Sequence, residues 1–103
     1  MKDYSNDIAE YWPTIMKAWQ VYRDRCPVIE CDLKERKVYA YPAKDYINSL
    51  SERTRAETLR QYKTLTASGG MMLFIKDPKR QVLKSYIFDA KEITLQNECE
   101  SQG

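Results

Sequence analysis

The sequence predicts an α+β fold in which two helices pack on a four-stranded antiparallel sheet made of two hairpins, in the order α-β-β-α-β-β. Two observations predict it. Apolar residues recur with helical spacing in two long segments, and each segment precedes a pair of short strand-like runs joined by a charged turn. A chain of 103 residues fits one domain. We place that domain at residues 1–90 and expect residues 91–103 to form a polar, flexible tail.

The first helix is predicted from an apolar stripe that begins near residue 8. Asp7 and Glu10 have the spacing of a capping box at its start. Pro13 lies inside the stripe, and its ring and missing N–H should kink or split the helix. Pro27 prevents continuation at the other end. The stripe consists of Ile8, Tyr11, Trp12, Ile15, Trp19, Tyr22 and Cys26.

The first hairpin follows, with strands at 28–32 and 37–41 and a turn through 34–36. Strand alternation gives it one apolar face, which includes Ile29 and Cys31, and one mixed face. That pattern is typical of a sheet covered on one side.

The second helix is predicted in two pieces. Pro42 ends the preceding strand, residues 43–50 form a helical turn or two, and Ser51 or Thr54 restarts the helix. The glycines at 69–70 end it, because glycine readily adopts the left-handed conformation that closes helices. Its buried stripe is Ala56, Leu59, Tyr62 and Leu65.

The second hairpin has strands at 71–76 and 81–89 around a turn through 77–80. Residues 71–75 are apolar on both faces of the strand. A strand of this kind is usually central in its sheet, with something covering each side.

Composition excludes several kinds of chemistry. The chain has no histidine, so Ser–His and Cys–His nucleophile pairs cannot form. Three cysteines, Cys26, Cys31 and Cys99, are too few for a four-thiolate zinc site and an odd number for a disulfide scaffold. We expect free thiols, with a Cys26–Cys31 bridge as the alternative. The protein is therefore predicted to be no enzyme and to bind no metal and no cofactor.

The predicted compartment is the cytoplasm. No segment approaches the ~20 apolar residues that span a bilayer, and the polar N-terminal residues lack the apolar run of a signal peptide. No membrane partner is expected.

The predicted sheet has a surplus of apolar side chains. If both helices pack on one face, the other face carries Tyr39, Tyr41, Val82, Tyr86 and Phe88. So much apolar area favours a protein interface, most simply that of a two-fold homodimer. Two alternatives stay open: one helix covers each face and the surplus is core, or the aromatic face stacks bases or a planar ligand.

Basic residues gather at the two predicted hairpin turns. They are Lys34, Arg36 and Lys37 at the first, and Lys76, Lys79 and Arg80 at the second. Exposed bases on turns usually keep strands soluble, but side by side they could bind phosphates. The net charge of +2 does not demand a polyanionic partner. The leading hypothesis is a small non-enzymatic interaction module, homodimeric, with a regulatory or accessory role. The alternative is a nucleic-acid-binding protein that uses the hairpin turns, with or without the aromatic face.

Overall fold

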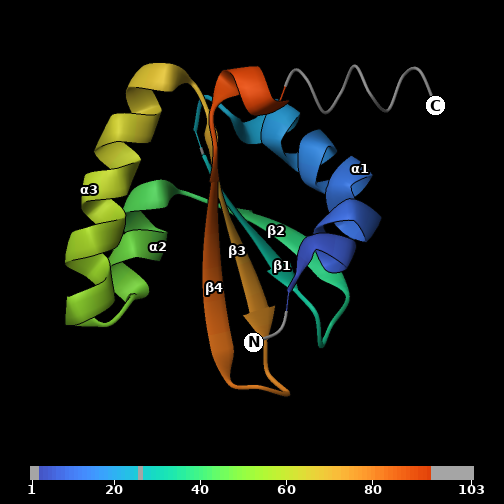
Figure 1. The fold of residues 1–103 in the computed structure, drawn as a ribbon. Helices are drawn as coiled ribbons and strands as arrows, with labels where there is room; N and C mark the ends of the chain where they lie inside the picture. Colours follow the sequence, from blue (N-terminus) through green and yellow to red (C-terminus); the bar gives the residue numbers. More distant parts are fainter. Residues whose placement is uncertain (1–2, 26, 94–103) are drawn as a thin grey trace.

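The α+β class is confirmed. The computed structural model describes residues 3–25 and 27–93. One mixed sheet lies between α1 on one face and α2 with α3 on the other (Figure 1). A helical turn at residues 90–93 follows the last strand. The elements are α1 (Ser5–Tyr22), β1 (Val28–Asp32), β2 (Lys37–Tyr41), α2 (Ala43–Ser49), α3 (Glu52–Ser68), β3 (Met71–Asp77) and β4 (Val82–Phe88).

The sheet is mixed, so the prediction of a purely antiparallel sheet is wrong. Its strand order is β2-β1-β3-β4, and β1 pairs with β3 in parallel. Every residue of β1 is buried, as are most residues of β3, so these two strands occupy the centre. Both run toward their own hairpin turns. Because the two central strands pair in parallel, both turns lie at the same end of the sheet (Figure 1).

The helices also differ from the predicted pair. The second predicted helix, which the sequence divides into two pieces, forms two separate helices, α2 and α3. They are separate because Leu50 adopts an extended conformation between them. The Ser51 side chain then caps α3 by accepting from the amide of Thr54 at 3.4 Å, and Gly69 ends it with a φ of 72°. The first helix starts at Ser5, before the predicted capping box, and continues through Pro13 without splitting. Pro13 is exposed, so its ring lies on the solvent side of α1.

Two apolar cores result, one on each side of the sheet. On the α1 side, Trp12 and Ile15 pack against side chains such as Leu73 of β3. On the other side, Tyr46 and Leu65 belong to the cluster that also contains Phe74. The first core also includes Ile93, which lies past the predicted end of the domain. The predicted tail from residue 94 onward lies outside the described residues.

The two hairpin turns share one local structure. Each has four residues between the paired Asp32–Lys37 and Asp77–Val82 positions. In each, the aspartate side chain accepts a hydrogen bond from the amide two residues later, at 3.0 Å for Asp32 and 3.2 Å for Asp77. The last loop residue has a positive φ in both turns. The two turns therefore have equal length. The sequence predicts a first turn, at 34–36, that is one residue shorter than the second, at 77–80.

A buried hydrogen bond joins α2 to the centre of the sheet. The Tyr46 hydroxyl donates to Oε2 of Glu30 at 2.8 Å, and both residues are buried. Burial, followed by this hydrogen bond, raises the pKa of Tyr46 far above its ordinary value. The folded protein therefore keeps a proton that the unfolded chain releases near pH 10, the ordinary tyrosine range.

From this we expect alkaline instability. The free energy of unfolding should begin to fall near pH 9, where the unfolded chain loses the Cys31 proton that burial retains in the folded protein. It should fall more steeply above about pH 10, because the unfolded chain then also gains stability by losing the Tyr46 proton. Tyr46→Phe should cost about 1–3 kcal/mol near neutral pH, since Glu30 loses its donor, and should make the alkaline decline shallower. Urea unfolding followed by tryptophan fluorescence across this pH range tests both. An equally steep decline in Tyr46→Phe would contradict the assignment.

Candidate interaction surface

The five aromatic-face candidates do not share one face of the sheet. Tyr41 packs against the core under α2 and α3, and Tyr39, two residues earlier on β2, lies on the same face. Tyr86 and Phe88 pack against the core under α1. Val82, at the start of β4, is exposed. Because helices cover both faces, most of this aromatic surplus is core, and the structure does not assemble the predicted aromatic surface.

Exposed apolar side chains gather instead along β4. Val82 is 39% exposed, Leu83 is 42% exposed and Ile87 is 41% exposed. Leu83 and Ile87 lie on the α2/α3 side of the sheet, since they pair in register with Lys76 and Met72 of β3. Leu83 and Ile87 are not among the site residues that the sequence predicts.

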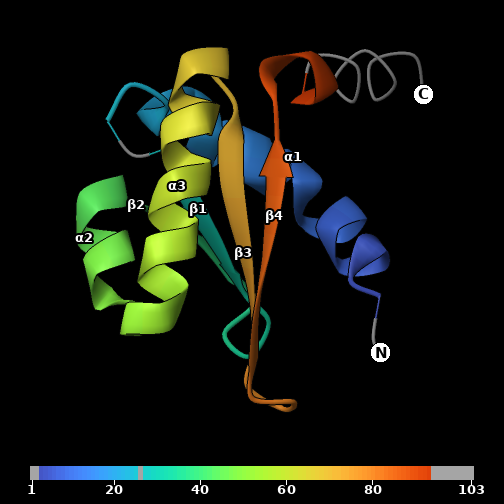
Figure 2. The same cartoon turned by 60° about the vertical axis from the view of Figure 1, so that its left-hand side comes forward.

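The backbone of β4 is also open at the edge of the sheet (Figure 2). Met72 donates its amide to Pro27 at 3.3 Å, and Lys76 accepts from Leu33 at 3.0 Å. Even-numbered residues of β3 therefore point their backbone groups toward β1, and odd-numbered residues point theirs toward β4. The register pairs odd residues of β3 with even residues of β4, as in Ile75–Lys84.

The odd-numbered residues of β4 consequently point their amides and carbonyls outward. These residues are Leu83, Ser85 and Ile87. In the described part of the chain, their backbone groups have no hydrogen-bond partner. The other edge strand, β2, differs in the exposure of its apolar side chains, because Val38 and Ala40 are partly buried against the core under α1. We call the outer edge of β4, with Leu83 and Ile87, the β4 edge.

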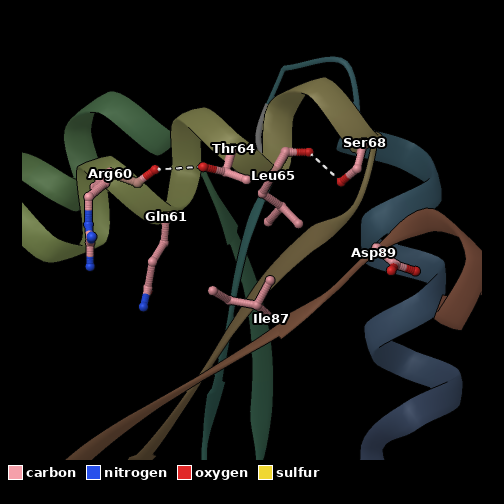
Figure 3. Close-up of a pocket in the computed structure, with 7 residues that line it drawn as sticks. All are labelled: Arg60, Gln61, Thr64, Leu65, Ser68, Ile87 and Asp89. Carbon is pink, nitrogen blue, oxygen red and sulfur yellow. Dashed lines mark hydrogen bonds between the residues drawn. The ribbon is translucent and has the colours of Figure 1, made fainter.

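A groove lies beside the β4 edge, between β4 and α3 (Figure 3). Its volume is about 510 Å³. Figure 3 shows Ile87 pointing from β4 toward Leu65 of α3, and Gln61 extending from α3 toward the strands. Asp89 lies at one end of the groove. The groove offers an apolar floor with a polar rim.

The two basic turns lie at the same end of the sheet, because β1 and β3, which lead into them, are parallel. Arg36 pairs with Glu10 at 3.5 Å, Lys76 with Asp32 at 3.8 Å, and Arg80 with Asp77 at 3.7 Å. Within the described residues, three bases at this end have no ion pair: Lys34, Lys37 and Lys79.

A second groove of about 860 Å³ lies at this end. Asp7, Glu10 and Asp77 line it together with four bases of the two turns, Lys34, Arg36, Lys79 and Arg80. Five acids accompany the six bases: Asp7, Glu10, Asp32, Glu35 and Asp77. This near balance of charge weakens the attraction for phosphates that the bases alone would have.

Cys31 lies on β1 and belongs to the core under α1. Burial raises the pKa of the Cys31 thiol to about 12, which suppresses the reactive thiolate. The Cys31 thiol is free. Cys26, the other residue of the alternative Cys26–Cys31 bridge, lies outside the described residues, as does Cys99. No cluster suited to a metal ion occurs among the side chains that the structure describes. None of the described helices is long and apolar enough to cross a membrane.

No protein-family model matches the chain, and neither a curated protein nor a solved structure matches it.

Proposed function

We propose that the protein is a small non-enzymatic interaction module that binds another polypeptide strand at the β4 edge. In this mode an extended segment adds to the edge of a sheet. Backbone hydrogen bonds hold the segment, and side-chain contacts select it. The module serves an accessory or regulatory role, because the part of the chain that the structure describes offers a binding surface and no reactive group.

The observation that carries the proposal is the coincidence of two features on one strand. The residues that turn their backbone groups outward include Leu83 and Ile87, which are also among the most exposed large apolar residues described. Soluble proteins usually protect such edges with charged residues, proline or a covering element. On β4, Lys84 is the charged residue within the strand, and it points to the opposite face. An apolar edge that no described element covers, next to a groove, fits a strand-binding surface.

The test is a selection from a library of random linear peptides with the purified protein as target. We expect enriched peptides with alternating apolar residues, and Ile87→Lys should abolish their binding. Leu59→Lys is the matched control. The sequence predicts Leu59 to be buried, but in the structure it is 41% exposed, as Ile87 is, and it lies on α3. Since a second copy of the chain could occupy the same edge, self-association that Ile87→Lys abolishes also supports the proposal. The proposal fails if neither a peptide nor a second copy depends on Ile87.

Nucleic-acid binding is the second candidate, favoured by the meeting of both basic turns at one end of the sheet (Figure 1). The accompanying acids argue against it. Binding of single-stranded RNA that weakens steeply with salt, and that is lost when Lys79 and Arg80 are both replaced, would support it instead.

A further inference from the structure

We propose that the strand bound at the β4 edge is β4 of a second copy of this chain, paired antiparallel about a two-fold axis at Ser85. This inference rests on the proposed function and names its partner. The two sheets would then join into one continuous sheet of eight strands, since each copy contributes four.

The register follows from the backbone. A symmetric antiparallel pair needs residues with outward-facing backbone groups opposite each other on both strands. In β4 these residues are Leu83, Ser85 and Ile87, and Ser85 is the midpoint of the strand Val82–Phe88. Centring the axis on Ser85 therefore pairs Ser85 with its own copy and Leu83 with Ile87 of the other copy. All the outward-facing groups of the strand then find partners.

The side chains are complementary in the same register. On the α2/α3 face, Leu83 of one copy meets Ile87 of the other, and the symmetric pair repeats the contact. On the α1 face, Val82 meets Phe88, and Lys84 meets Tyr86 rather than another lysine. The exposed apolar residues of β4 are thus covered by apolar residues, and like charges are not placed directly opposite each other. The grooves of the two copies lie on the same face and border the shared apolar stripe.

The charges at the ends of β4 fit this arrangement as well. Antiparallel pairing brings the turn after β3 of one copy, with Lys79 and Arg80, alongside the segment after β4 of the other. That segment contains Asp89 and Glu92. The amide of Asp89 donates to the Glu92 carboxylate at 3.0 Å, and the amide of Glu92 donates to the Asp89 carboxylate at 2.8 Å. Lys91 lies between them, so the segment 89–92 has a charge of −1 and faces two bases. The basic turn thereby gains a partner without any nucleic acid.

Disulfide trapping tests the register directly. In a chain with Cys26 and Cys99 changed to serine, Ser85→Cys should form a covalent dimer under mild oxidation. Directly opposed residues of a hydrogen-bonded antiparallel pair have Cα atoms about 5.5 Å apart, within disulfide range. Leu83→Cys alone should not link, because its two copies would be four residues out of register, roughly 14 Å apart. Mixed with Ile87→Cys, however, it should give the mixed dimer.

The possible results separate this inference from the proposed function. Sedimentation that finds only monomer at high concentration overturns the second copy as partner, while peptides selected at the same edge would keep the strand-binding function. A dimer that links through Leu83→Cys alone, or equally well through Leu59→Cys on α3, overturns the register. Linking of Ser85→Cys together with the mixed Leu83–Ile87 product supports it.

Discussion

Gly70→Ala is expected to destabilise the fold by about 3 kcal/mol, within the range for inserting atoms into a packed site. Gly70 is buried between α3 and β3, one residue before the strand begins. A Cβ atom there would overlap the carbonyl oxygen of Phe88 and lie 2.8 Å from the Cα of Asp89. These are backbone atoms of β4 and its end, so they can move only if the strand shifts.

Gly69→Ala is the matched control, one residue away. A Cβ atom at this position meets nothing within 4 Å. The cost should be about 1 kcal/mol and should come from the left-handed φ of 72° alone. Urea unfolding monitored by circular dichroism measures both variants. Equal destabilisation by the two substitutions would mean that the close approach of Gly70 to β4 does not matter for stability.

The strand pattern of the sequence is enough to predict the α+β class, but not the pairing of the central strands. Residues 71–75 are apolar on both faces, and β3 is indeed central. The matching signal in β1 is obscured by Glu30 and Asp32, which look like solvent-facing positions. Both are buried, because the Tyr46 hydroxyl and the amides of the first turn supply hydrogen bonds. The partner of Glu30 lies in α2, sixteen residues away, so local pattern could not reveal that β1 is also central.

The β4 edge was also hard to predict from the sequence, because its exposure depends on contacts between distant segments. Alternation correctly separates Leu83 and Ile87 from Tyr86 and Phe88 on β4. Which face is covered depends on tertiary packing: α3 lies over the centre of the sheet and leaves a groove beside Ile87. The tyrosines of the sheet do not indicate an open surface, because a tyrosine can bury its ring while its hydroxyl keeps a hydrogen-bond partner. Tyr39, for instance, donates to Glu35 at 2.7 Å.

Two proline substitutions on adjacent residues of β4 are expected to have opposite effects. Lys84 points its amide toward Ile75 of β3, so Lys84→Pro removes a hydrogen bond of the sheet. We expect a loss of about 3 kcal/mol in the free energy of unfolding, or no folded protein at all. Ser85 points its amide outward, so Ser85→Pro removes no hydrogen bond within the chain and should fold with nearly unchanged stability.

Dimer formation, in contrast to folding, should be weakened by Ser85→Pro. In the symmetric pair, Ser85→Pro removes one amide donor from each copy, and its ring crowds the facing strand. Two lost hydrogen bonds are worth about 2 kcal/mol, roughly a 30-fold weaker dimer. Sedimentation over a range of concentrations measures the dissociation constant, and dilute samples report the stability of the separate chain. If Ser85→Pro folded normally and assembled as well as the original protein, the β4 edge would not be the binding surface, because a strand paired there in this register uses the Ser85 amide.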